Sequence, residues 1–290
     1  MLLQRVITAS VLAPLVVLAI FMLPHVYFAL IWGVILLIAA WEWTNLAEVK
    51  TILGKLAFLV AMVVPMLFLQ FWTQVLEVLA QLTNYPDIRN YSGAIETLMI
   101  PAVLFWIWTM LRIRNSGAEL LEKQQSTVKK LFTGGFVLVM AWHFLSRLMV
   151  LEEPAMTMYF FLLIWGADIG AYFVGKKFGI TKLAIEISPG KTLEGMYGAL
   201  IAAAVLGLVL SLFFSFSVLV SIDFILLSLI TVLVSIYGDL FFSAAKRIRG
   251  VKDSGSILPG HGGLLDRLDS IIAAIPVFYA GVWFIRWMYS

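Results

Sequence analysis

The sequence contains no cysteine, and it has only three histidines among its 290 residues. Without cysteine the chain cannot form a disulfide framework or a cysteine-ligated zinc or iron–sulfur site. The histidines are widely separated along the sequence, which argues against a histidine-based metal site; they are His25, His143 and His261. Charged residues are scarce too, at 13%, about half the share found in soluble domains. These shortages exclude several common metal and redox sites and argue against a soluble protein.

Hydrophobic residues make up 62% of the chain, and its mean hydropathy is +1.00. A helix needs about 20 mostly apolar residues to cross the hydrocarbon core of a bilayer. Nine such stretches are present, over residues 6–23, 26–43, 53–72, 97–111, 131–149, 156–175, 196–214, 224–242 and 270–288. Residues 74–81 either extend the third stretch or lie on the membrane surface. We therefore predict an all-α polytopic integral membrane protein with about nine transmembrane helices.

The basic residues predict the orientation of these helices. All but three of the 20 basic residues fall at the N-terminus or in every second loop, the exceptions being Arg89, Arg147 and Arg286. Loops rich in lysine and arginine face the cytoplasm. The N-terminus is therefore expected in the cytoplasm and the C-terminus outside. We expect a multi-pass protein of the cell inner (cytoplasmic) membrane.

The two halves of the chain differ in character. Residues 1–150 contain about five apolar helices and no evident motif, whereas residues 151–290 contain about four helices with acidic residues and Gly-rich and Lys-rich loops. We interpret the second half as a catalytic domain. No internal repeat is visible, so the inverted repeats of many transporters are missing.

Acidic residues within apolar stretches are the first sign of a site. Asp168 lies eight residues before Lys176, and Asp239 lies seven residues before Lys246. At 1.5 Å per helical residue, both acids are roughly 10–12 Å below the basic ends of their helices. An ionised carboxylate at that depth is costly unless it faces water, a cation or a partner. The matching depths predict one shared polar cavity open to the cytoplasm.

Two further acids, Asp266 and Asp269, share a helix face at the same inner surface. Carboxylates without cysteine or histidine ligands suit a hard cation such as Mg²⁺. Nearby loops supply the donors that a polyphosphate requires, namely Lys191, Lys246, Arg247, Lys252 and Arg267, with Gly262 and Gly263 allowing close backbone approach. Ser188 and Pro189 are read as the start of a helix that faces an anion, with Thr192 close by. Acids, bases and exposed amides together indicate phosphoryl or nucleotidyl transfer.

Each feature also has a plainer interpretation. Either membrane acid alone could be a hydrogen-bonded packing residue, and the basic loops act chiefly as topology signals. The glycine pairs at 166/170 and 175/179 favour close helix packing, and Pro-Gly-Lys-Thr lacks the glycine spacing of a P-loop. We interpret His143 as an interfacial or packing residue. Glu42 either extends to the membrane surface or braces the site, and we favour the former. His261, between glycines in the acidic loop, favours a functional role.

A longer pattern runs from Ser243 to Asp269. It reads Ser-Ala-Ala-Lys246-Arg247-x4-Lys252-Asp253-Ser-Gly-x2-Leu-Pro-Gly-His261-Gly262-Gly263-Leu-Leu-Asp266-Arg267-Leu-Asp269. It resembles the signature of the phosphatidate cytidylyltransferase, or CDP-diacylglycerol synthase, family. The upstream segments around Asp168 and from Ser188 to Gly195 also resemble that family, although Ile169 stands where a serine is expected.

The resemblance implies a metal-dependent reaction in which the phosphate of phosphatidate attacks the α-phosphorus of CTP and releases pyrophosphate. It assigns Mg²⁺ to Asp239 and Asp266, with Asp269 and Asp168 as additional candidates and room for a second cation. Lys252, Asp253 and His261 are the remaining catalytic candidates. The expected partners are CTP, phosphatidate and membrane lipid, with no nucleic acid; a homodimer is compatible with the sequence.

Two other classes of protein stay open at this point. A related polyprenol or lipid kinase would share the metal and phosphate chemistry. A cation-coupled transporter would explain the membrane acids, but it would not explain a Gly-rich basic loop confined to one side. The Asp-Gly-x2-Ala-Arg pattern of CDP-alcohol phosphotransferases is absent.

Overall fold

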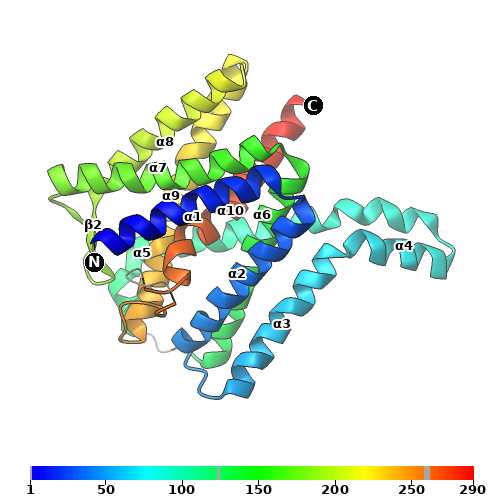
Figure 1. The fold of residues 1–290 in the computed structure, drawn as a ribbon, viewed down its shortest axis with the longest axis horizontal. Coiled ribbons are helices and arrows are strands. Elements are labelled where there is room, and N and C mark those ends of the chain that lie inside the picture. Colours follow the sequence, from blue (N-terminus) through cyan, green and yellow to red (C-terminus); the bar gives the residue numbers. More distant parts are fainter. Residues whose placement is uncertain (1, 123–124, 258–261) are drawn as a thin grey trace.

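The computed structural model describes residues 2–122, 125–257 and 262–290 and is almost entirely helical (Figure 1). The helices are α1 (Leu2–Met22), α2 (His25–Leu46), α3 (Ile52–Gln70), α4 (Trp72–Thr83), η1 (Pro86–Leu98), α5 (Met99–Glu122), α6 (Thr127–Leu151), α7 (Pro154–Phe178), α8 (Leu193–Phe213), α9 (Val218–Ile248) and α10 (Leu265–Tyr289). A single short hairpin, β1 (Lys182–Ala184) and β2 (Ser188–Thr192), joins α7 to α8.

Eight helices in the described part of the chain are long and apolar enough to cross a membrane. They coincide with the second to ninth stretches predicted from hydropathy, and the first stretch corresponds to α1. The prediction of an all-α polytopic membrane protein is confirmed. Residues 74–81, left undecided by the sequence, belong to the separate 12-residue helix α4.

Hydroxyl side chains fix the starts of four helices. Thr51, Ser126, Thr192 and Ser217 each accept a hydrogen bond from the backbone N–H three residues later. Such caps satisfy one of the four donors that a helix start leaves without a partner. Helix α10 is different, because its own first residues provide no capping side chain.

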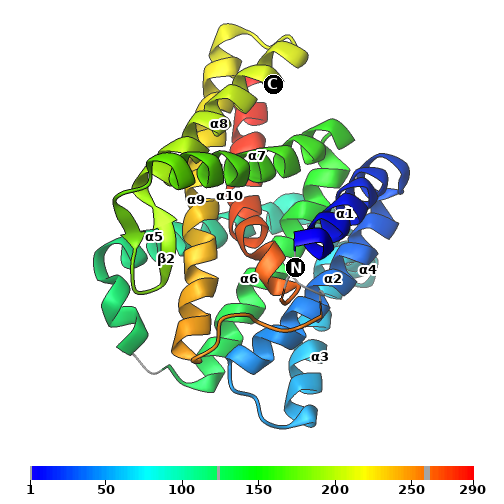
Figure 2. The same ribbon diagram turned by 60° about the vertical axis from the view of Figure 1, so that its left-hand side comes forward.

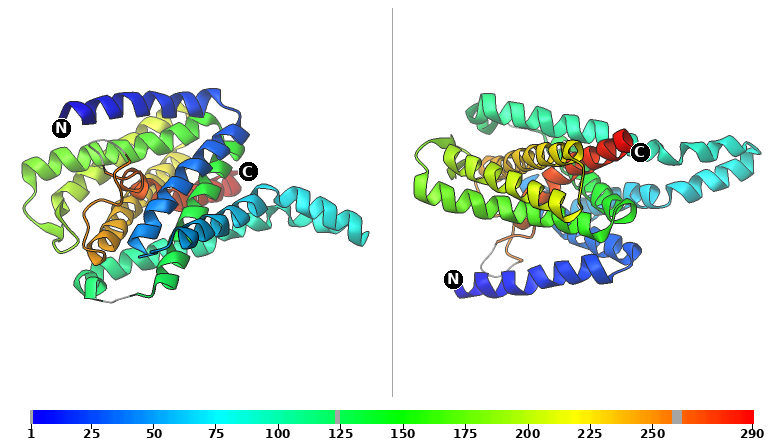
Figure 3. Two further views of the ribbon diagram at one scale, coloured as in Figure 1. Left: turned by 60° about the horizontal axis from the view of Figure 1, so that its bottom comes forward. Right: turned by 90° about the horizontal axis from the view of Figure 1, so that it is seen from above.

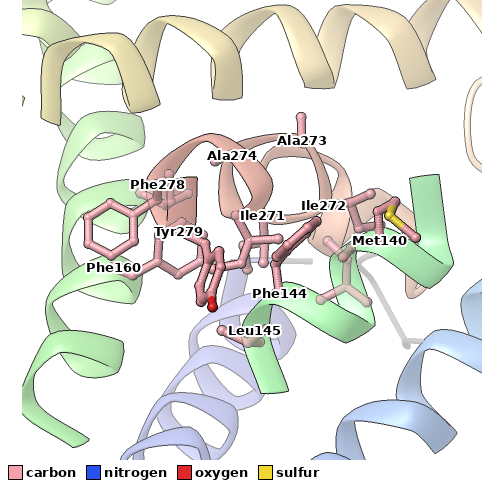
Figure 4. Close-up of a cluster of buried hydrophobic side chains, with 14 of the residues drawn as sticks. Met140, Phe144, Leu145, Phe160, Ile271, Ile272, Ala273, Ala274, Phe278 and Tyr279 are labelled. Carbon is pink, nitrogen blue, oxygen red and sulfur yellow. The ribbon is translucent and has the colours of Figure 1, made fainter. Parts of the chain in front are cut away.

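Helix α10 is the centre of the core. It packs against α2, α5, α6, α7 and α9, and Figure 2 shows it enclosed by its neighbours. In Figure 4, Phe144 of α6 lies beside Tyr279 of α10, with ring centroids 5.1 Å apart, and Phe160 of α7 lies beside Phe278. Helices from both halves of the sequence therefore share one core.

Glycines allow the helices of the second half to approach closely. A Cβ atom at Gly170 of α7 would lie 2.7 Å from the carbonyl oxygen of Gly198 of α8, which is too close for any side chain. Likewise, a Cβ atom at Gly238 of α9 would lie 2.1 Å from that of Ala273 on α10. The packing role predicted for Gly170 is confirmed. The contact at Gly238 brings α9 and α10 together beside Asp239.

The α4–η1 segment projects beyond the helical bundle (Figure 3). An exposed ion pair between Glu77 of α4 and Arg89 of η1, 2.6 Å apart, joins its two arms. The hydrogen bond from Arg89 lowers the pKa of Glu77 to about 2. This carboxylate is therefore ionised at any physiological pH.

The loops are sorted between two ends of the molecule. The start of α1, the β1–β2 hairpin and the segment between α9 and α10 lie at one end, while the C-terminus and the α4–η1 segment lie at the other (Figures 1 and 3). This division follows the partition of basic residues in the sequence. The end that carries the hairpin is the one whose loops are basic.

Candidate active site

The polar centre of the molecule lies between the hairpin, α7, α9 and α10. On α9, Asp239, Ser243 and Lys246 follow one another at helical spacing and share one face. The hairpin brings Lys191 to this face, and α10 begins beside it with Asp266. Residues from three separate parts of the second half therefore meet at one place.

Lys191 and Asp239 form the first ion pair of the site. The Lys191 Nζ lies 2.6 Å from Asp239 Oδ2, and both side chains stay partly exposed, at 25% and 30%. Ser243 donates a hydrogen bond of 3.1 Å to Asp239 Oδ1, and Lys191 also donates to the carbonyl oxygen of Ile236. Asp239 is thus oriented by two side chains and still faces open space.

Lys246 and Asp266 form the second ion pair, which is almost completely buried. The Lys246 Nζ lies 2.6 Å from Asp266 Oδ1, with side-chain exposures of 9% and 7%. The other oxygen, Asp266 Oδ2, accepts the backbone N–H groups of Ser254 and Gly263, each at 2.9 Å. Asp266 therefore holds Lys246 and also fixes both ends of the segment that connects α9 to α10.

Two more carboxylates complete the centre. The carboxyl group of Asp168 interacts electrostatically with the charges of Lys191, Asp239 and Arg267. The carboxyl group of Asp269 interacts in the same way with Asp239, Lys246 and Lys191. Asp269 is buried, with 8% exposure, whereas Asp168 is exposed. Asp168 and Asp239 are therefore near enough for their charges to interact, and their matching depth in the membrane stays a prediction.

The donor set of this centre fits a hard divalent cation. Its acids provide oxygen ligands only, which is the donor type that a hard cation prefers. Within the described ranges, no three histidine or acidic side chains lie close enough to hold a metal by themselves. Mg²⁺ commonly takes only one or two carboxylates and completes its shell with water and phosphate.

Glu42 takes the second of the two roles that the sequence left open, because it braces Ser254 and the start of α10. Its carboxylate is 1% exposed and accepts hydrogen bonds from Ser254 Oγ and from the backbone N–H groups of Leu264 and Leu265, at 2.8–3.0 Å. It therefore supplies the cap that α10 lacks. The expectation that Glu42 extends to the membrane surface was wrong. The missing cap at Leu264 and Leu265 was the available signal, because an uncapped helix start needs acceptors from elsewhere.

Two glycines of the loop are required by Glu42. A Cβ atom at Gly255 or at Gly263 would lie 2.4 Å from an oxygen of this carboxylate. Gly262 has a φ of +83°, a conformation that glycine adopts without strain. These glycines are thus needed for close packing and turning, and the N–H of Gly263 is already bonded to Asp266.

The prediction that Ser188 and Pro189 start a helix was wrong. These residues do not start a helix; they begin β2, which pairs antiparallel with β1. Helix α8 starts four residues later, at Leu193, where the Thr192 hydroxyl accepts the N–H of Gly195 at 3.1 Å. Thr192 was the better cap because the apolar helical run starts directly after it. The predicted phosphate ligands Ser188 and Thr192 therefore lie in a hairpin, with the Thr192 hydroxyl used in the fold.

The other predicted residues lie at the rim of the centre or beyond it. Arg247 donates to the carbonyl oxygens of Ile187 and Val251, which ties the hairpin to α9. Lys252, Asp253 and Arg267 are exposed. His261 lies outside the described residues.

His143 supports the packing interpretation made from the sequence. It is buried, with 3% exposure, and lies edge-on to Phe144 at 4.9 Å. Among the described residues, no contact joins His143 to the polar centre.

Comparisons with known proteins agree with this geometry. A family model described as the cytidylyltransferase family matches residues 3–285. The chain is 36% identical over 298 residues to the phosphatidate cytidylyltransferase of Haemophilus influenzae, covering 96% of this chain and 97% of that protein. It is also 36% identical to the phosphatidate cytidylyltransferase of Pseudomonas aeruginosa, covering 99% of both chains. The protein of that name from Bacillus subtilis is 45% identical over 145 residues, about half of each chain.

Proposed function

Because the chain belongs to the cytidylyltransferase family, we propose that it transfers the CMP group of CTP to phosphatidate, giving CDP-diacylglycerol and pyrophosphate. It is a multi-pass membrane enzyme of the nucleotidyltransferase class. The observation that carries the proposal is the polar centre of four carboxyl groups and three cationic side chains at the basic end of the bundle.

The reaction joins two polyanions, so its main demand is charge neutralisation. An oxygen of the phosphatidate phosphate forms a bond to the α-phosphorus of CTP, and the bond from that phosphorus to the oxygen of the β-phosphate breaks. The acceptor is already an anion, so no strong general base is required. Lys191, Lys246 and Arg267 are suited to bind phosphate oxygens by charge-assisted hydrogen bonds.

We propose that Asp239 and Asp266 hold Mg²⁺, with Asp168 and Asp269 supporting it. When bound, Mg²⁺ supplies charge stabilisation to phosphoryl oxygens in the transition state. In the structure Lys191 forms an ion pair with Asp239, and Lys246 forms one with Asp266. If these carboxylates held a metal cation, the ammonium groups of Lys191 and Lys246 would be available to phosphate oxygens.

The position of the centre suits an amphiphilic substrate. Asp239 lies two helical turns, roughly 10 Å, from Lys246 toward the interior of the bundle. A lipid phosphate can reach this depth while its chains remain in the bilayer, and CTP can enter from the aqueous side. We place this side in the cytoplasm, with the protein in the cell inner membrane.

Turnover should depend on both substrates and on a divalent cation. Purified protein given radiolabelled CTP, phosphatidate and Mg²⁺ is expected to produce lipid-soluble label, and EDTA should abolish it. Magnesium added in excess of EDTA is the control and should restore the rate. Equal activity with ATP in place of CTP, or with diacylglycerol in place of phosphatidate, would favour a lipid kinase and contradict the proposal.

The cytoplasmic orientation has its own test, made simple by the lack of native cysteine. Single cysteines at the exposed positions Lys50, Lys182 and Lys252 should resist an impermeant maleimide in intact cells. Cysteines at Arg89 and Ser290 should react. Labelling of position 252 before cell lysis would reverse the proposed topology.

A further inference from the structure

A cavity lies close to the polar centre, on the other side of α9. It has a volume of about 110 Å³ and is formed by α2, α5, α6 and α9. Its walls are mainly apolar, with Trp43, Phe105 and Phe241 among them. The rings of Trp43 and Phe241 stack 6.0 Å apart. This space fits part of a hydrocarbon chain.

The two sites occupy opposite faces of α9. Asp239, Ser243 and Lys246 face the polar centre, whereas Ala244 and Ile248 line the cavity. At 3.6 residues per turn, Ile248 projects on the side of the helix opposite Asp239. A molecule in the cavity therefore cannot contact the carboxylate of Asp239 from the same position.

The cavity has a basic rim at the end of the molecule that carries the hairpin. Arg112, Lys129 and Lys130 all line it. Lys130 is paired with Glu48 at 2.8 Å, and Arg112 lies over the ring of Trp108. Neither Arg112 nor Lys129 has an acidic partner among the side chains that the structure describes, which do not include those of residues 116–124. The described side chains of the rim thus place positive charge beside an apolar cavity.

Thr109 gives an independent sign of a ligand. This residue lines the cavity and is only 4% exposed, yet its hydroxyl has no hydrogen-bond partner among the described residues. Buried hydroxyl groups nearly always have one. Thr109 lies three residues before Arg112 on α5, so it shares that helix face about 4.5 Å deeper. In a glycerophospholipid, ester carbonyl oxygens lie just below the phosphate in the same order.

We propose that this cavity binds a membrane phospholipid with an anionic head group, at a site separate from the polar centre. The phosphate contacts Arg112 and Lys129, an ester carbonyl accepts a hydrogen bond from the Thr109 hydroxyl, and one acyl chain lies along the aromatic wall of the cavity. A bound lipid would support the wall of α9 that positions Lys246 and Asp239. The proposal does not depend on the reaction, because lipid occupancy can be measured without CTP.

Native mass spectrometry of the detergent-solubilised protein tests this with dioleoyl phosphatidylglycerol, whose phosphate is a diester and cannot act as the acceptor. The wild type should retain one such lipid in preference to dioleoyl phosphatidylcholine. The double variant Arg112→Ala/Lys129→Ala should lose about tenfold in affinity for phosphatidylglycerol and lose the preference. Thr109→Val, which keeps the shape of the side chain, should lose about threefold.

A variant that fills the cavity distinguishes lipid binding at this site from binding at the polar centre. Ala245→Leu, which adds bulk to the cavity wall, should lower the occupancy of both lipids to background, while Ala57→Leu at an exposed position of α3 should not. Wild-type lipid occupancy in both Ala245→Leu and the double variant would overturn the proposal. Loss of the lipid in Asp239→Asn alone would also overturn it. A change of oligomeric state in Ala245→Leu with unchanged lipid binding would overturn it too, because the cavity would then be a contact between copies.

Discussion

Asp239→Asn is expected to lower kcat/KM by about a thousandfold or more while leaving the protein folded. The substitution keeps the shape and the hydrogen bond from Ser243 but removes the charge that pairs with Lys191. It would also remove the main proposed ligand of Mg²⁺. Loss of such charge stabilisation costs about 4 kcal/mol in the transition state, which corresponds to this factor.

The same helix provides a matched control for this variant. Asp223, near the other end of α9, accepts a hydrogen bond from Tyr289 and lies far along the helix from Lys191. Asp223→Asn should therefore keep a near-normal rate. The two rates are compared by CTP-dependent labelling of phosphatidate at saturating Mg²⁺, with size-exclusion profiles to check folding. Near-normal turnover in Asp239→Asn would remove this carboxylate from the catalytic centre.

Glu42→Ala is expected to reduce both stability and turnover, although Glu42 belongs to the half of the chain without motifs. The change leaves Ser254 Oγ and the N–H groups of Leu264 and Leu265 without their buried acceptor. Hydrogen bonds to charged groups contribute about 1.5–3 kcal/mol each, so the three together should cost at least about 3 kcal/mol. The melting temperature should fall by about 5 °C or more, and kcat by about a hundredfold.

Thermal unfolding in detergent, followed by tryptophan fluorescence, measures the first effect. Glu77→Gln is the matched control because it removes a carboxylate from an exposed ion pair outside the bundle. It should change neither melting nor turnover appreciably. If Glu42→Ala melts and turns over like the wild type, the cap on α10 is not needed to hold the loop.

Membrane spans could be predicted from the sequence because each depends on one continuous apolar run. Asp168 and Asp239 could be linked for a similar reason, since the distance of each from the basic end of its helix follows from helical rise alone. The hairpin was missed because its five-residue strand Ser188–Thr192 has no alternating apolar pattern, and its structure depends on pairing with β1. Contact with α9 through Lys191 and Arg247 then holds it in place.

The partners of Glu42 could not be predicted because they are far away in the sequence, so the choice between its two possible roles needed the structure. Ser254 is 212 residues further along, and no local pattern around Trp-Glu-Trp indicates which segment it meets. The pairing of Lys246 with Asp266 also needed the structure. Sequence places both residues at the same surface, but only the packing of Gly238 against Ala273 brings α9 and α10 close enough.

The long separation between Glu42 and its partners has a consequence for biosynthesis. Helix α2 is made early, whereas Ser254, Leu264 and Leu265 are among the last parts of the chain to be synthesised. At about 5 to 20 residues per second, a ribosome needs on the order of 10 to 40 s to cover the 212 residues between them. During that interval the carboxylate of Glu42 lacks these partners, and only water at the edge of the bilayer can replace them. Insertion of the last helix then buries it, so Glu42 and the start of α10 reach their final hydrogen bonds in the same step.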